Sequence, residues 1–216
     1  MSKSFMFLGC LLMFGIFLST TATAEEFSMR KTSVTAEQTN NKNIYVKAGI
    51  GGMLLPFSSY KAGFSFGIEG GSRVYRHLQS SLSVGLGVDY YSIDKSGSTG
   101  SQQAGTISYS MTGYAIPVLL KCAYTYTIND RIDVYAGIGL GMAASKVDTS
   151  ISGFSSVSEQ SSAFAFSLYP GITINKIGPG ALFAEIDFLS STVSYKTTGS
   201  ANIGGTLLLL GYSIYF

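Results

Sequence analysis

Charged residues are scarce in this sequence: they make up 12% of its 216 residues, against about 25% in ordinary soluble domains. Long apolar runs are also missing. Beyond residue 24, no apolar stretch is long enough to cross a bilayer as a helix, although the chain is 46% hydrophobic. A chain that is apolar overall but has no long apolar segment is typical of strands in which apolar and polar residues alternate.

The first 24 residues are predicted to be a secretory signal peptide. Lys3 provides the basic start, Phe5 to Leu18 the apolar segment, and residues 21–24 the small-residue cleavage pattern. Cleavage removes Lys3 and Cys10, so 14 basic residues become 13 against 12 acidic ones, a net charge of about +1. That balance gives no electrostatic basis for nucleic-acid binding. Cys122 is left alone and cannot form an intramolecular disulfide. Residues 25–42 are polar without a period, and we expect them to be a flexible periplasmic lead-in.

The single histidine, His77, limits the chemistry that the chain can perform. His77 lies in the first predicted turn, at the opposite end of the predicted strands from the outer surface. A Ser-His-acid triad at the outer surface would therefore need a second histidine, and so would a histidine-based metal site. The glycines at 137, 139 and 141 are spaced by two and lack the spacing of a nucleotide-binding loop. We therefore expect no enzymatic activity, no catalytic residue, no cofactor and no metal.

From Asn43 onward, eight segments alternate apolar and polar residues with a period of two. They lie at 44–51, 64–73, 82–90, 114–125, 132–141, 164–173, 182–188 and 208–216. Every charged residue within the first seven segments falls on the face opposite the apolar row: Lys47, Glu69, Arg73, Asp89, Lys121, Asp133, Glu185 and Asp187. A soluble sandwich would show the same alternation with its apolar face inward and its charges outward.

Three features favour a membrane barrel over a sandwich. The polar face is rich in Gly and Ser, which suits a narrow lumen better than a solvated surface. The signal peptide directs export, and the last strand ends the chain without a polar tail. The sequence thus predicts an all-β fold, an eight-stranded antiparallel up-and-down transmembrane β-barrel spanning residues 43–216. With no tryptophan, the interfacial aromatic girdles must consist of Tyr and Phe, with candidates Tyr90, Tyr114, Tyr124, Tyr212 and Phe216.

The connections between the predicted strands alternate in length. Short turns are expected at 74–80, 129–131 and 175–180. Longer loops rich in Ser, Gly and Thr are expected at 55–61, 94–105, 146–161 and 196–201. Barrels of the outer membrane place short turns in the periplasm and longer loops outside.

The end of the chain carries the most specific pattern, because alternate residues of the last strand form one apolar face: Leu208, Leu210, Tyr212, Ile214 and Phe216. This ending resembles the terminal strand of bacterial outer-membrane β-barrels. Tyr114 to Lys121, the Asn129-Asp130-Arg131 turn and Val134 to Gly141 likewise resemble the central hairpin of the outer-membrane protein β-barrel domain family, which includes opacity, OmpA-type and OmpX-type barrels. The resemblance implies that the terminal strand is the signal read by the barrel assembly machinery.

The eight inward charges allow two interpretations. They can neutralise one another and plug the lumen, or they can line a narrow path for ions or solutes. Eight strands enclose an interior that side chains just fill, which favours the plug. We expect a protein of the bacterial outer membrane, in contact with outer-membrane lipids, that acts structurally or by surface interaction. An extracellular ligand would bind its loops in adhesion or host contact. A small channel and, less favoured, a lipid-modifying enzyme are the alternatives.

Overall fold

The computed structural model describes residues 43–54, 60–61, 63–101, 105–153, 156–196 and 199–216. The predicted signal peptide and lead-in lie outside these residues. Among the residues that the structure describes, no helix is long and apolar enough to cross a membrane.

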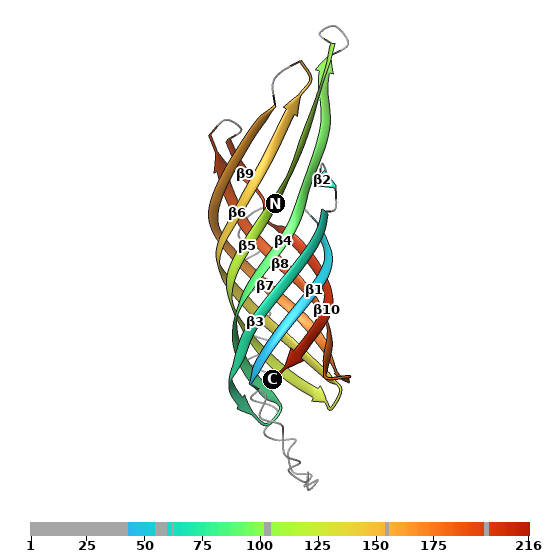
Figure 1. Cartoon of the computed structure of the whole chain (residues 1–216), viewed down its shortest axis with the longest axis vertical. Helices are drawn as coiled ribbons and strands as arrows, with labels where there is room; N and C mark the ends of the chain where they lie inside the picture. The colour runs from blue at the N-terminus through green and yellow to red at the C-terminus, as the bar shows by residue number, and fades with distance from the viewer. Residues whose placement is uncertain (1–42, 55–59, 62, 102–104, 154–155, 197–198) are drawn as a thin grey trace. The chain divides into compact units, whose positions relative to one another are not determined.

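The described chain consists of β-strands joined by short connections (Figure 1). Their bounds are β1 Ile44–Leu54, β2 Tyr60–Lys61, β3 Gly63–His77, β4 Ser80–Ser101, β5 Gly105–Asn129, β6 Ile132–Ile151, β7 Val157–Ile177, β8 Gly180–Tyr195, β9 Gly199–Asn202 and β10 Gly205–Tyr215. β2 is a two-residue strand that pairs with β4. The other nine follow one another around the sheet, with β9 and β10 both paired to β8.

The sheet closes on itself because β10 pairs with both β8 and β1. The β1–β10 ladder runs from Tyr45↔Tyr215 to Leu54↔Thr206, and Phe216 N–H donates to the Ile44 carbonyl at 2.8 Å. All neighbouring strands are antiparallel. The prediction of an eight-stranded up-and-down barrel is confirmed.

β9 and β10 act as one strand of this ring. They are separated by Ile203 and Gly204, whose N–H groups both donate to the Ser191 carbonyl, at 3.0 and 3.3 Å. Gly204 N–H also donates a hydrogen bond to the Asn202 side-chain oxygen, at 2.9 Å. One irregularity at this point therefore accounts for the two separate strand labels.

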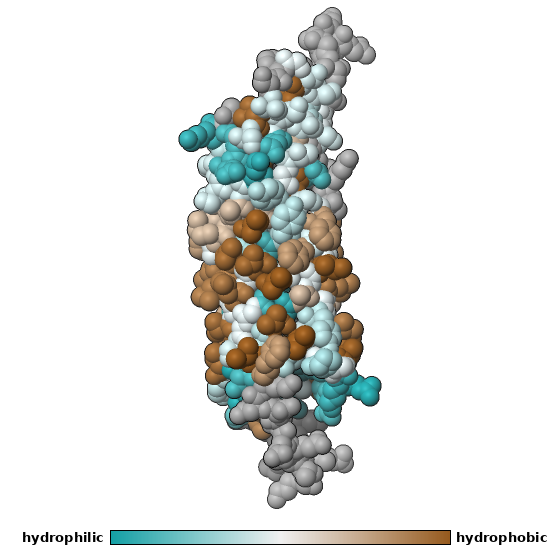
Figure 2. Space-filling model, viewed as in Figure 1, coloured by the Kyte–Doolittle hydropathy of each residue, from teal (hydrophilic) through white to brown (hydrophobic). Residues whose placement is uncertain are grey.

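The barrel wall is apolar outside and polar inside. Ile50, Leu120 and Leu210 are between 60% and 66% exposed, whereas the inward Lys121 and Glu185 are only 2% and 3% exposed. On the face shown in Figure 2, the outward apolar residues form a belt across the middle of the barrel. Large exposed apolar surface on eight strands, β1, β3 to β8 and β10, is unfavourable in water and is what a lipid environment requires. The belt is therefore the membrane-facing surface.

The strand ends differ from the sequence prediction. The turns are shorter than expected, with Leu78-Gln79, Asp130-Arg131 and Gly178-Pro179 between strands. The segments expected to be loops at 94–105 and 146–161 are mostly strand, because β4 continues to Ser101 and β7 begins at Val157. The expected loop at 196–201 likewise overlaps β9, and that at 55–61 lies mainly outside the described residues. The predicted loop bounds were wrong because period-two alternation disappears where both faces of a strand meet water, while backbone pairing continues.

Candidate functional site

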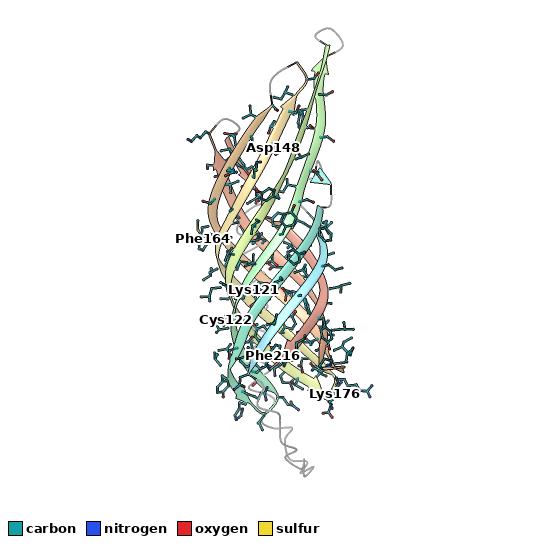
Figure 3. The ribbon with its side chains drawn as sticks, in the orientation of Figure 1. Lys121, Cys122, Asp148, Phe164, Lys176 and Phe216 are labelled. Atoms are coloured by element: carbon teal, nitrogen blue, oxygen red, sulfur yellow. The ribbon has the colours of Figure 1, made fainter. Side chains whose placement is uncertain are left out.

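Five inward side chains from four strands meet midway along the barrel and form what we call the lumen charge cluster: Lys47, Glu69, Lys121, Glu185 and Asp187. Glu185 bridges the two lysines, with its Oε2 2.8 Å from Lys47 Nζ and its Oε1 3.2 Å from Lys121 Nζ. Glu69 Oε2 lies 3.6 Å from both ammonium groups. Asp187 Oδ2 lies 3.6 Å from Lys121. Figure 3 labels Lys121 about midway along the barrel.

Tyrosines on the same inward face support the cluster. Tyr45 hydroxyl donates to Glu69 Oε1 at 2.5 Å, and Tyr135 hydroxyl donates to Glu185 Oε2 at 2.8 Å. Lys121 Nζ lies 4.5 Å from the centre of the Tyr169 ring, within the range of a cation–π contact. Buried charges need partners of this kind to offset their desolvation.

Inward glycines make room for these large side chains. A Cβ on Gly137 would lie 2.4 Å from the Tyr169 ring, and one on Gly171 would lie 2.3 Å from Tyr135. A Cβ on Gly87 would lie 3.1 Å from the Lys121 methylenes. The glycine-rich face that the sequence displays is thus the space into which lumen tyrosines and lysines fit.

The remaining three of the eight inward charges lie outside these ion pairs. Asp89 is buried and its carboxylate lies over Gly67, but it has no ion pair with the cations among the described residues. Asp133 accepts a hydrogen bond from the Asn175 amide at 2.7 Å. Arg73 stacks on the Tyr215 ring, 4.4 Å from its centre.

An apolar layer occupies the lumen between the charge cluster and the loop end. Its fully buried members come from several strands and include Met53, Tyr91, Leu119, Val193 and Leu207. Tyr91 hydroxyl also donates to the Ile203 carbonyl across the barrel at 2.6 Å. On the turn side of the cluster lies a polar cavity of about 40 Å³, whose lining includes Arg73, Asp133 and Tyr215. The lumen is therefore layered, with a polar vestibule, a charge cluster and an apolar layer in sequence.

The terminal strand lies in the barrel seam. Leu208, Leu210 and Ile214 face outward and are exposed, as is Phe216 at the end of the chain. Tyr212 hydroxyl donates to the Ile177 carbonyl at the turn end. The expected girdle residues Tyr90 and Tyr114 stack on each other, with ring centres 5.9 Å apart. Cys122 is part-exposed on the outward row.

Strands β4 to β7 extend well past the ends of β1 and β3 at the loop end (Figure 1). They contain 22, 25, 20 and 21 residues, whereas crossing a bilayer needs about 9–11. We call the extension, residues 92–101, 105–112, 146–151 and 157–162, the protruding sheet. β4 and β5 pair as far as Ser101↔Gly105, and β6 and β7 as far as Thr149↔Val157.

Sequence reasoning missed two parts of this arrangement. The alternation places three tyrosines on the same face as the inward charges, so it could have identified them as partners of the cluster: Tyr45, Tyr135 and Tyr169. In the protruding sheet, apolar and polar residues do not alternate, so the sequence gives no signal of a strand there. No group of three or more His, Cys, Asp or Glu side chains in the described part of the chain is placed to hold a metal ion.

A closed ring of eight strands, an apolar outer belt and a polar interior define a transmembrane β-barrel. The sequence matches the family described as outer membrane protein beta-barrel domain over residues 8–216. The chain belongs to this family, and it is a protein of the bacterial outer membrane, as the sequence predicted.

Solved structures with similar folds include other barrels of the outer membrane. Neisserial surface protein A is 17% identical, with a TM-score of 0.49, and the match covers 80% of this chain and 96% of that one. Ail, the attachment invasion locus protein of Yersinia pestis, is 15% identical, with a TM-score of 0.41, covering 80% and 97%. The outer membrane protease OmpT from Escherichia coli is 7% identical, with a TM-score of 0.46, covering 81% and 97%. No curated protein matches the sequence significantly.

Proposed function

We propose that this protein is a surface-interaction barrel, in which a membrane-embedded wall with a plugged lumen displays the protruding sheet to the outside. The observation that carries the proposal is the unequal length of the strands. β1 ends at Leu54 and β3 begins at Gly63, while the β4–β5 and β6–β7 ladders continue for many residues beyond the belt. A barrel needed only as a membrane anchor gains nothing from this extension.

The protruding sheet has two edges that suit an extended peptide partner. On one side, the β2–β4 pairing reaches Lys95, and β4 continues to Ser101. On the other side, the β7–β8 ladder reaches Ala165↔Ser191, and β7 extends to Val157. Sheet edges of this kind bind extended segments by adding a strand, with backbone hydrogen bonds providing affinity. Adhesion or host contact through this sheet is the role that we propose.

The layered lumen favours this role over a channel. The apolar layer contains side chains with no exposed surface, such as Met53 and Leu119, and a buried apolar layer opposes the passage of hydrated ions. The cavity of about 40 Å³ lies on the turn side of the cluster. We propose no catalytic role, since His77 lies at the turn end of β3, stacked on Tyr75.

A binding screen with trimmed hairpins tests the proposal. One variant replaces Ser96–Ser110 by a two-residue turn, and the other replaces Asp148–Ser158, cutting each hairpin at a paired position. Binding of host cells or matrix proteins that falls with either variant, while the barrel remains heat-modifiable on gels, supports the proposal. Unchanged binding by both variants, or steady single-channel conductance of the intact protein in planar bilayers, would overturn it.

A further inference from the structure

The polar cavity on the turn side of the lumen charge cluster contains two charged side chains that take no part in the ion pairs of the cluster. Arg73 of β3 and Asp133 of β6 both line this cavity, whose volume is about 40 Å³. In the described part of the chain, neither side chain has an ion-pair partner. The cavity therefore presents one cation and one carboxylate, and each is available to a ligand.

The carboxylate of Asp133 is buried with only one of its oxygens satisfied. The residue is 6% exposed, and its Oδ2 accepts a hydrogen bond from the Asn175 amide at 2.7 Å. Its Oδ1 has no hydrogen-bond partner among the described residues. A buried carboxylate oxygen without a donor is unfavourable. Since Asp133 lines the cavity, a ligand that carries a donor can satisfy this oxygen.

The guanidinium of Arg73 lies over the Tyr215 ring, with Cζ 4.4 Å from the ring centre. Stacking of this kind uses the face of the guanidinium, and its N–H groups, which lie in its plane, are left for other partners. An arginine binds a carboxylate through two parallel hydrogen bonds. Arg73 is therefore placed to bind the acidic group of a ligand in the cavity.

The charges on the cavity wall favour a ligand that carries both signs. A simple anion beside Arg73 would also face Asp133 and Glu69, which line the same cavity. A simple cation beside Asp133 would likewise face Arg73 and Lys47. The rest of the lining consists of hydroxyl-bearing side chains, and Ala123 is its one aliphatic residue among the described residues. An apolar ligand would therefore find little to contact.

Size and access both suit a small molecule that enters from the turn end. A volume of about 40 Å³ holds about three water molecules. That is the scale of the smallest amino acids, and it leaves no space for a large side chain. Tyr45 and Tyr135 are buried, whereas Arg73, Thr125 and Tyr215 are partly exposed. The cavity is therefore closed toward the charge cluster and open toward the turns.

We infer that this cavity is a binding site for a small zwitterion, an α-amino acid of the size of glycine or alanine. The carboxylate of the ligand pairs with the Arg73 guanidinium, and its ammonium group donates to Asp133 Oδ1. One ligand thus satisfies both groups that the protein leaves without ionic partners. The site lies at the end of the barrel opposite the protruding sheet, and the inference is independent of the surface-interaction role.

Saturation-transfer NMR of the purified full chain in deuterated detergent tests the inference, with glycine as the probe. Glycine should bind saturably. Glycinamide, which lacks the carboxylate, and N-acetylglycine, which lacks the ammonium group, should bind roughly tenfold or more weakly. R73Q and D133N should each weaken glycine binding by a similar factor. R131Q removes an exposed arginine that does not line the cavity, and it should match the wild type.

D133N carries a second expectation that a misfolded barrel could not meet. It should bind acetate more tightly than the wild type does, because the carboxylate that opposes an anion beside Arg73 is gone. The R73Q/D133N double variant should lose this gain. Acetate binding by D133N that is no tighter than that of the wild type would contradict the pairing of the ligand carboxylate with Arg73.

The comparison of glycine with its two analogues uses the wild-type protein, so it does not depend on the folding of any variant. Absence of saturable glycine binding at roughly tens of millimolar would overturn the inference and leave water as the occupant of the cavity. Equal binding of glycine and glycinamide would overturn it as well. A loss of glycine binding in R131Q as large as in R73Q would place the effect outside the cavity and would also overturn it.

Discussion

Lys121 is the residue whose replacement should most disturb the lumen. It is ion-paired with Glu185, Glu69 and Asp187, so Lys121→Met leaves three buried carboxylates facing one remaining lysine. Removing one member of a buried ion pair costs about 3–5 kcal/mol, and we expect a loss of that size. Urea unfolding followed by circular dichroism and by the gel shift of the folded barrel measures it, since the chain has no tryptophan to follow by fluorescence.

Adding Asp187→Asn to Lys121→Met should recover part of that loss. Lys121 is the ion-pair partner of Asp187 in the described residues, and Asp187 Oδ1 has no hydrogen-bond partner there. Asp187→Asn alone should lower the free energy of unfolding less than Lys121→Met does. Carboxylates outnumber lysines in the lumen charge cluster, and Asp187→Asn removes one of the negative charges. Wild-type stability of Lys121→Met would show that water, not protein, neutralises the carboxylates.

Gly137 should not tolerate even a methyl group. A Cβ there would lie 2.4 Å from the Tyr169 ring and 2.6 Å from the Cys122 carbonyl oxygen. Overpacking of this kind costs about 1–3 kcal/mol, so Gly137→Ala should lower the free energy of unfolding by that amount. The matched control is Gly70→Ala, where a Cβ would meet nothing within 4 Å. Equal stability of the two variants would mean that the lumen is loosely packed.

The outer face should reject charge at the belt and accept it on the protruding sheet. Leu120 and Leu210 lie in the belt, and an Arg near the bilayer midplane costs about 2–4 kcal/mol. Leu120→Arg or Leu210→Arg should therefore destabilise the barrel in lipid vesicles, and Ile138→Arg likewise. Ser158→Arg, on an exposed position of the protruding sheet, should be nearly neutral in the same unfolding assay. Similar tolerance at both kinds of position would show that the apolar rows do not face lipid.

At the residue scale, the sequence predicts which side of the wall a residue faces but not which residues meet. Parity places Lys47, Lys121 and Glu185 inward together. Their contact depends on strand tilt and on closure of the β1–β10 seam, which no local pattern encodes. Arg73 also faces inward, but it stacks on the Tyr215 ring instead of joining the lumen charge cluster. It lies just before the register shift between Arg73 and Tyr75.

At the scale of the strand, the sequence predicts the membrane-crossing part of each strand but not the part that continues beyond the belt. Lipid outside and a polar lumen inside impose the alternation that reveals a strand such as Ile132–Gly141. Beyond the belt, β6 continues to Ile151 with water on its outer face. The Ser- and Thr-rich composition there is equally compatible with a loop, so only the pairing of β6 with β7 distinguishes the two.

The last strand makes its own prediction, because its final residue closes the seam. Phe216 N–H donates to the Ile44 carbonyl at 2.8 Å, and Ile44 N–H donates back at 3.3 Å. Deletion of Phe216 removes both bonds and the exposed aromatic side chain. We expect slower assembly and a smaller heat-modifiable fraction in the outer membrane, measured on gels after a pulse of expression. Ser200→Ala, an exposed change on β9, should assemble normally, and normal assembly without Phe216 would contradict the proposed signal.

At the scale of the whole molecule, the barrel combines a fixed wall with an exposed extension. The charge cluster and the apolar layer tie strands from all sides of the lumen together. The protruding sheet is held by its own ladders, and Ile93 and Val147 at its base pack in the apolar layer. Such a division gives a rigid support in the membrane and a sheet that contacts the outside. Figure 3 shows Asp148 and Lys176 toward opposite ends of the barrel.

Cysteine labelling on intact cells tests that division most directly. In a Cys122→Ser background, Ser110→Cys and Ser158→Cys on the protruding sheet should react with a membrane-impermeant maleimide. Leu210→Cys in the belt should remain unlabelled, and Lys176→Cys at the turn end should react only after the outer membrane is permeabilised. Labelling of Lys176→Cys on intact cells, with Ser110→Cys and Ser158→Cys protected until permeabilisation, would contradict the account, because the protruding sheet would then face the periplasm.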